Sequence, residues 1–143
     1  MAEPDPQAWE NALISDIRAH GGKVTTGPLA GESLLLMYSK GARTGERRRA
    51  MLNFSRDGDA YVVAGTAGGS PTDPGWVSNV QANPGVEVEI GDETHRATAI
   101  VADPENQTRL WDQHVETYPR FAPYPDQTGR VIPMVRITLD GKR

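Results

Sequence analysis

The sequence predicts a mainly β domain of the α+β type, a small barrel of about six antiparallel strands with short helices. Short runs rich in β-branched, aromatic and leucine residues recur from residue 33 onward, separated by glycine-containing turns of hairpin length. Apolar residues at helical spacing occupy only short segments. A barrel suits these strands because closure removes exposed sheet edges, so we expect a single domain over residues 1–143.

Residues 1–32 predict a helix followed by a loop, and residues 33–143 predict the barrel. In residues 7–20 the apolar side chains follow helical spacing and the run ends in two glycines, which is typical of an amphipathic helix. We expect this helix to pack on the domain. Peripheral contact with a membrane surface stays open as the alternative, although such helices normally carry more basic residues.

Three strands are expected next, as an antiparallel meander. Their segments are SLLLMYSK, RRAMLNFSR and AYVVAGT, and the turns between them are GARTGE and DGD. Asp73 and Pro74 then predict the N-cap and first residue of a short helix that ends near Ala82. Residues 85–101 predict a hairpin, because apolar and polar side chains alternate around a Gly-Asp turn.

The last expected elements are a helix and a strand. Asp103 and Pro104 repeat the capped start of a helix, and an apolar stripe then extends to Tyr118. The segment RVIPMVRITL, residues 130–139, predicts the final strand. Since proline cannot donate a ladder hydrogen bond, we expect Pro133 at an edge or a bulge.

Composition excludes several classes of protein. The chain carries a formal net charge of −4, whereas phosphate-backbone binding needs a basic face, so we expect no nucleic-acid partner. The absence of cysteine excludes disulfides, thiolate nucleophiles and cysteine-ligated metals. The histidines lie on different predicted elements without metal-ligand spacing, and we expect no metal. Without a signal peptide or membrane-spanning run, we expect a cytoplasmic protein with no integral membrane segment.

Two glycine-containing loops form the candidate site. The first, KGARTGERRR at residues 40–49, offers arginines and adaptable backbone to a phosphate or carboxylate. The second, GTAGGSPTDP at residues 65–74, runs into a helix N-terminus, where free N–H groups favour an anion. Their nearness in a meander predicts one extended site for a multiply charged ligand. The alternatives are a solvated hairpin tip with ordinary turns, or a polyanion site at that tip.

These loops belong to a longer run that resembles a known family. The segment from LLLMYSKGARTGERRR to NPGVEVEI, followed by YPRFAPYPDQTGRVIPMVRI, is similar to the deazaflavin (coenzyme F420)-dependent nitroreductases over residues 33–139. The order G-x-x-[ST]-G-x-x-R, a Gly-Gly turn, P-x-W-x-x-N and N-P carries the resemblance. It implies a split β-barrel, the architecture shared with FMN-binding oxidases. It also implies a reductase that uses the reduced cofactor, F420H2.

The resemblance assigns cofactor-binding residues. The phosphate and anionic tail would be held by Gly41, Ala42, Arg43, Thr44, Gly45 and Arg48. The deazaflavin ring would lie against Thr66, Ala67, Gly68, Gly69, Trp76 and Asn79. Arg47 and Arg49 receive no role. Ala67 stands where some family members carry a lysine, so one charged contact to the cofactor would be missing here.

Substrate and chemistry follow from the same resemblance. The substrate would contact Asn53, Tyr118, Phe121 and Tyr124. Family members transfer a hydride from F420H2 to electron-poor small molecules, namely unsaturated lactones such as coumarins and aflatoxins, quinones, or nitro compounds. Asn53 and Phe121 stand where a nitroimidazole-selective relative has tyrosines, which favours lactones and quinones. Thr66 or Tyr124 would bind the resulting anion as the catalytic residue, with water as the alternative proton donor.

The sequence leaves three alternatives open. FMN is the alternative cofactor, because it also carries a phosphate on a ribityl chain. A non-catalytic module that binds a deazaflavin or another ligand in the same groove is the alternative function. The oligomeric state is open between monomer and homodimer.

Overall fold

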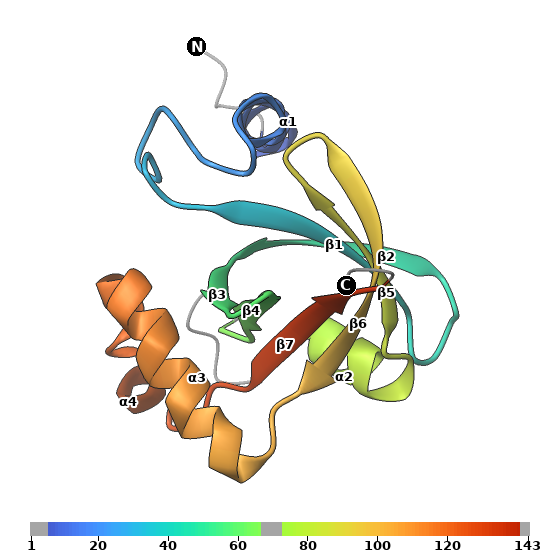
Figure 1. Cartoon of the computed structure of the whole chain (residues 1–143), viewed down its shortest axis with the longest axis vertical. Coiled ribbons are helices and arrows are strands. Elements are labelled where there is room, and N and C mark those ends of the chain that lie inside the picture. Colours follow the sequence, from blue (N-terminus) through green and yellow to red (C-terminus); the bar gives the residue numbers. More distant parts are fainter. Residues whose placement is uncertain (1–5, 67–72, 141–143) are drawn as a thin grey trace.

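The computed structural model describes residues 6–66 and 73–140 (Figure 1). In these ranges it shows one curled antiparallel sheet with short helices around it. The strands are β1 (Leu34–Lys40), β2 (Arg47–Asn53), β3 (Ser55–Asp57), β4 (Ala60–Ala64), β5 (Gly85–Ile90), β6 (Glu93–Val101) and β7 (Met134–Leu139). The helices are α1 (Pro6–Ala19), α2 (Gly75–Ala82), α3 (Pro104–Thr117), the 3-10 helix η2 (Pro119–Phe121) and α4 (Tyr124–Thr128). The predicted mainly β fold is confirmed, with a 7-stranded sheet in place of about six strands.

The pairings of the predicted meander are confirmed, but its middle segment, RRAMLNFSR, does not form one strand. It bends at Phe54 into β2 and β3, which lie at opposite ends of the strand order β2-β1-β5-β6-β7-β4-β3. β2 pairs with β1 and β3 pairs with β4, so one bent segment supplies both edges of the sheet. The Phe54 ring packs edge-on against Tyr61 of β4, with 5.2 Å between ring centroids. The curl visible in Figure 1 brings these two edges of the sheet together.

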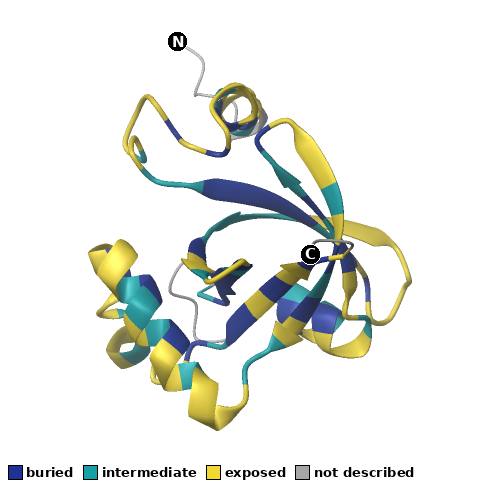
Figure 2. Ribbon diagram, in the orientation of Figure 1, coloured by how far each residue is buried: buried dark blue, intermediate teal, exposed yellow. Residues whose placement is uncertain are grey.

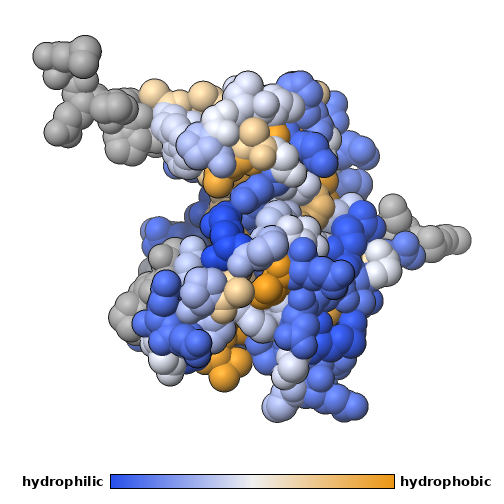
Figure 3. Space-filling view, turned by 90° about the vertical axis from the view of Figure 1, so that its left-hand side faces the viewer, coloured by the Kyte–Doolittle hydropathy of each residue, from blue (hydrophilic) through white to orange (hydrophobic). Residues whose placement is uncertain are grey.

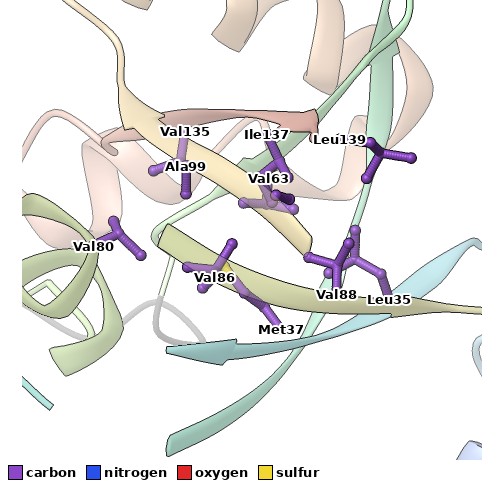
Figure 4. Packing of buried hydrophobic residues seen from close by; sticks show 11 residues of the cluster. Leu35, Met37, Val63, Val80, Val86, Val88, Ala99, Val135, Ile137 and Leu139 are labelled. Carbon is purple, nitrogen blue, oxygen red and sulfur yellow. The ribbon is translucent and has the colours of Figure 1, made fainter. Parts of the chain in front are cut away.

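The core lies inside the curl, where alternate residues of the strands face one another (Figure 4). Figure 2 shows the same alternation as buried and exposed bands along β7. Burying one such aliphatic side chain contributes about 1.5–3 kcal/mol relative to leaving it exposed, so the buried cluster inside the curl is the main source of stability for the sheet. The cluster consists of Leu35, Met37, Val63, Val80, Val86, Val88, Ala97, Ala99, Val135, Ile137 and Leu139.

α1 packs on the sheet, as its apolar spacing predicts. Leu13 and Ile17 are buried in a cluster with Leu34 of β1, and Met51 of β2 packs against it. Trp9 belongs to the same predicted stripe but is 55% exposed. Among the helices described, none has the length and apolarity that crossing a bilayer requires.

One predicted helix cap is confirmed and the other is wrong. Asp103 caps α3, because its carboxylate accepts a hydrogen bond from the Asn106 N–H at 2.9 Å. α2 ends where predicted, but its N-cap is Pro74 and no side chain caps it. The Asp73 carboxylate instead accepts a hydrogen bond from Arg130 Nη1 at 2.6 Å. The Asp73 carboxylate therefore binds Arg130 and does not cap α2.

The β5–β6 hairpin is confirmed, whereas the final strand starts later than expected. β5 and β6 pair along the whole length of β5. β7 lies between β6 and β4 and begins at Met134, so Pro133 stands just before a central strand. Its missing N–H removes no ladder bond there, and its carbonyl accepts from the Gly65 N–H at 2.8 Å.

We expect Gly91→Ala to destabilise the fold more than Gly58→Ala. Both glycines have a φ of 60°, so each alanine would carry the strain of the left-handed region, about 1–2 kcal/mol. At Gly91 an added Cβ would also lie 2.8 Å from the Gly21 Cα, whereas nothing lies within 4 Å at Gly58. Urea unfolding should show an extra loss of roughly 1–3 kcal/mol for Gly91→Ala. Equal losses would contradict the close packing of the β5–β6 turn on the loop after α1.

Candidate functional site

The β1–β2 loop is a compact turn with backbone donors left over. The Gly41 N–H donates to the Glu46 carbonyl at 2.7 Å, and the Gly45 N–H donates to the Gly41 carbonyl at 2.9 Å. Gly45 has a φ of 73°, which a residue with a side chain rarely adopts. Within the described part of the chain, the N–H groups of Arg43 and Thr44 have no hydrogen-bond acceptor. The loop therefore presents two amide donors to any ligand outside it.

Asn79 joins this loop to α2. Its Oδ1 accepts from the Ala42 N–H at 3.0 Å, and its Nδ2 donates to the Ser39 Oγ at 3.5 Å. Trp76 is half-buried and lies three residues earlier, so both side chains share one side of α2. The β1–β2 loop is thus attached to α2, the helix that follows the second predicted loop.

Arg48 and Arg43 are two cations at the β1–β2 loop that remain available to a ligand. Arg48 lies directly opposite Ser39 in the β1–β2 ladder, so its side chain shares the face that carries Asn79. Its Nη2 is 3.0 Å from the Glu46 carboxylate, and both side chains are more than half exposed. Such exposed ion pairs contribute little, about 0–1 kcal/mol, and can be exchanged for an anion. Arg43 has no charged partner among the described residues.

Arg47 and Arg49 point to the opposite face of β2, where they form ion pairs on the outer side of the sheet. The Arg47 guanidinium lies 4.0 Å from the centroid of the Tyr38 ring and 2.7 Å from a Glu87 carboxylate oxygen. Arg49 donates to the carboxylate of Glu10 in α1 at 2.6 Å. These contacts account for the two arginines to which the sequence assigned no role.

Arg130 holds the start of the second loop, and sequence reasoning missed it. Its Nη2 donates to the Thr66 carbonyl at 2.9 Å, and its Nη1 donates to the Gly65 carbonyl at 3.0 Å and to Asp73 at 2.6 Å. An arginine after a short helix carries no sequence signal for such contacts. The ring-side residues predicted between these anchors lie outside the described residues: Ala67, Gly68 and Gly69.

Tyr118 and Phe121, two of the predicted substrate residues, are buried. The Tyr118 hydroxyl donates to the Phe54 carbonyl at 2.6 Å, so it braces the bend between β2 and β3. Burial raises the pKa of this hydroxyl. The Phe121 ring stacks between His114 and Tyr124, with centroid distances of 5.5 Å to each. Tyr124 is only half-buried, so it is the most accessible ring of the stack.

Asn53, the fourth predicted substrate residue, belongs to a polar cluster with Glu32 and Arg120. Arg120 binds the Glu32 carboxylate through two hydrogen bonds of 2.9 Å, and Asn53 bonds to both partners. Hydrogen bonding to Arg120 holds the pKa of Glu32 below its ordinary value. Glu32 and Arg120 line a cavity of about 470 Å³ together with Tyr118. Figure 3 shows the same side of the molecule narrowed at a waist where hydrophilic side chains gather.

His114 is a buried neutral group at the end of the ring stack opposite Tyr124. Its Nδ1 lies 2.7 Å from the Ser55 Oγ, and its Nε2 has no hydrogen-bond partner within the described residues. Burial, with a contribution from Arg120, lowers the pKa of His114 to about 4. It therefore carries no charge at neutral pH. The described residues contain no group of three or more potential His, Cys, Asp or Glu metal ligands.

A family model described as F420H(2)-dependent quinone reductase matches residues 12–139. The chain belongs to this family. Membership confirms the predicted enzyme class, an oxidoreductase, and the predicted cofactor, F420H2. The residues of the reductase fit that cofactor, because Arg43, the exposed Arg48 and two unbonded backbone N–H groups are donors that could bind a phosphate. FMN binding and a non-catalytic role have no comparable support.

Individual relatives agree with the family match. An F420H(2)-dependent quinone reductase of Mycobacterium tuberculosis (strain ATCC 25618 / H37Rv) is 38% identical over 107 residues, covering 73% of this chain and 72% of the relative. A solved F420-H2 dependent reductase (FDR-A) has a TM-score of 0.66 and 33% identity, covering 73% of this chain and 93% of that one. A structure described as a domain-swapped dimer has a TM-score of 0.68 and 29% identity, covering 94% and 100%. The predicted split β-barrel is thereby confirmed.

We expect His114 to make the reductase less stable at mildly acid pH. The folded-state pKa of about 4 lies below the ordinary 6.5, so the unfolded chain binds the proton more readily. The stability contribution is therefore present above pH 6.5 and is lost as the pH falls toward 4. Between pH 7 and pH 5 the loss from this group is roughly 2 kcal/mol.

Urea unfolding at pH 5, 6 and 7 measures this loss. The variant His114→Gln keeps a polar side chain for Ser55 but does not titrate, so its stability should change less over the same range. The lowered pKa values of Glu32 and Asp57 act at lower pH, because their ordinary values are 4.5 and 3.8. Parallel pH profiles for the two proteins would contradict a neutral buried His114.

Proposed function

We propose that the reductase binds F420H2 between the β1–β2 loop and α2 and reduces quinones. The observation that carries this proposal is the hydrogen bond from the Ala42 N–H to Asn79 Oδ1 at 3.0 Å. This bond attaches a loop rich in hydrogen-bond donors for an anion to α2, the helix that follows the proposed ring-binding segment. One elongated ligand with a charged end and an aromatic end could contact both elements at once.

The proposed phosphate site is made by the loop from Gly41 to Gly45 together with Arg48. Backbone N–H groups and a planar guanidinium can together satisfy several phosphate oxygens. Arg43 would add a second cation for the anionic tail. Arg47 and Arg49 are left out of the site because their guanidinium groups already bind Glu87 and Glu10 on the other face.

The proposed ring site lies next to Thr66, with Trp76 and Asn79 on the facing side of α2. Ala67, Gly68 and Gly69 complete it in our proposal, since small residues let the backbone approach a flat ring closely. When bound, F420H2 supplies the hydride. The part of the protein is to hold the ring and the acceptor in a reactive orientation and to exclude water, which is where most of its rate advantage would arise.

The proposed acceptor site uses the aromatic stack that ends in Tyr124. A flat electron-poor ring can lie against Tyr124, whose half-buried ring stacks on Phe121 at 23°. The names of the relatives favour quinones as the acceptor. Unsaturated lactones have a similar flat shape and stay within the proposal. Nitro compounds are the weakest candidates, because Asn53 and Phe121 replace tyrosines of a nitroimidazole-selective relative.

We infer a homodimer. A similar structure at 29% identity is described as a domain-swapped dimer. Light scattering on the purified chain would measure the oligomeric state directly, and a monomer mass at micromolar concentration would contradict the dimer.

Arg48→Ala is expected to weaken F420 binding far more than Arg49→Ala. Losing one charge-assisted hydrogen bond to phosphate costs about 1.5–3 kcal/mol, which corresponds to roughly 10- to 100-fold in affinity. Arg49 is the matched control, because it is the adjacent arginine but points to the other face of β2. Fluorescence titration with oxidised F420 and with FMN gives the dissociation constants. Equal effects of both variants, or tighter binding of FMN than of F420, would refute the proposed site.

Tyr124→Phe tests the proposed proton donor. If the Tyr124 hydroxyl protonates the reduced acceptor, its loss should lower kcat for menadione by roughly 100-fold or more, while F420 affinity stays unchanged. Thr66→Val makes the same test for the other predicted donor. If neither variant lowers kcat by more than a few fold, water is the donor and both side chains only orient the acceptor.

A further inference from the structure

Arg130 is bonded to three acceptors, which belong to two segments next to the proposed ring site. Its guanidinium donates to the carbonyls of Gly65 and Thr66, at the end of β4, and to the carboxylate of Asp73, just before α2. The side chain of Arg130 is only 13% exposed, whereas that of Asp73 is 48% exposed. These three hydrogen bonds hold the guanidinium in one position. Breaking any of them would leave part of a nearly buried charge without a partner, which is energetically unfavourable.

The backbone around Arg130 also belongs to the end of α4. The Arg130 N–H donates to the Thr128 Oγ1 at 3.3 Å, and Thr128 Oγ1 donates in turn to the Tyr124 carbonyl at 2.8 Å. Gly129 ends the helix with a φ of 70° and an N–H bond of 2.9 Å to the Pro125 carbonyl. The position of Arg130 is therefore coupled to the helix that begins with Tyr124.

The backbone that Arg130 holds has little room to move. A Cβ added to Gly65 would lie 2.9 Å from the Pro133 Cγ and 3.0 Å from the Val77 Cγ2. The Gly65 N–H is meanwhile bonded to the Pro133 carbonyl. The start of α2, the end of β4 and the segment before β7 thus meet at Gly65. Arg130 adds a hydrogen bond to the Gly65 carbonyl at this contact.

We propose that Arg130 is a positioning residue that sets the distance and angle between Thr66, α2 and Tyr124. In the function proposed above, on which this inference rests, Thr66 and α2 hold the cofactor ring and Tyr124 faces the acceptor. One guanidinium then controls how closely the two reactants meet. A lysine cannot replace it, because a single ammonium lacks the planar pair of donors that reaches both carbonyls and the carboxylate.

The test compares Arg130→Lys with Arg136→Lys. Arg136 also donates to a carboxylate, Asp57 Oδ2 at 3.0 Å, but it lies on the exposed side of β7 outside the candidate site. For each protein we would measure the thermal midpoint without ligand, the dissociation constant and emission spectrum of bound oxidised F420, and kcat with F420H2 and menadione. These readouts separate stability, cofactor binding and reactive geometry.

We expect Arg130→Lys to lower kcat by roughly 10- to 100-fold, because a displacement of about 1 Å between reactants can cost that much. The emission spectrum of bound F420 should shift, while the F420 dissociation constant changes no more than in Arg136→Lys. Because Arg130 is nearly buried and Arg136 is exposed, Arg130→Lys should have the lower thermal midpoint, and kcat is compared at a temperature at which both variants are folded. Asp73→Asn removes the charge of one acceptor and leaves both carbonyl bonds, so it should produce a smaller loss of kcat in a folded protein. This second variant decides the question if Arg130→Lys does not fold.

A kcat for Arg130→Lys within about twofold of the wild type would overturn the positioning role, as would equal losses in both lysine variants. For Asp73→Asn the overturning result is an unchanged kcat and an unchanged spectrum. If the wild-type protein itself does not bind F420, the proposed function fails together with this inference. Tight wild-type binding with an unaffected Arg130→Lys variant would overturn the inference alone.

Discussion

The bend of the chain at Phe54 is the constraint on which the rest of the structure depends. β2 and β3 are consecutive in sequence yet pair with β1 and β4, so the sheet curls until its two edges join at one residue. The Tyr118 hydroxyl donates to the Phe54 carbonyl and thereby fixes the end of α3 against the bend. A flat sheet would leave both edges open and the inner aliphatic residues in water.

The curl also explains how an acidic chain presents a cationic loop. Successive residues of β2 point to opposite faces, so the run of arginines is divided between two environments. Arg47 and Arg49 are neutralised on the outer face by Glu87 and Glu10, which belong to β5 and α1. Arg48 stays beside α2 with only an exposed partner in its own loop. Local positive charge therefore coexists with a net charge of −4.

Much of the fold was predictable because its signals are local. The α3 cap at Asp103 depends on residues three positions apart, and the β5–β6 hairpin depends on alternation around one turn. The bend at Phe54 was not predictable, since the apolar pattern of RRAMLNFSR continues through it without a glycine or proline. Asp73 has every feature of an N-cap. It fails as one because Arg130, which is 57 residues away in sequence, binds its carboxylate.

The sequence by itself determined the class of fold and the family, because both depend on patterns in contiguous residues and their spacing. It also predicted the loop that we propose as the anion site. Only the tertiary structure decided which arginines remain available to a ligand, that the Tyr118 hydroxyl donates to the Phe54 carbonyl, and that Arg130 binds both Thr66 and Asp73, just before α2. These contacts link segments far apart in the chain. Which partner a side chain meets depends on the segments that the curled sheet places beside it. A local sequence pattern contains no information about those distant segments.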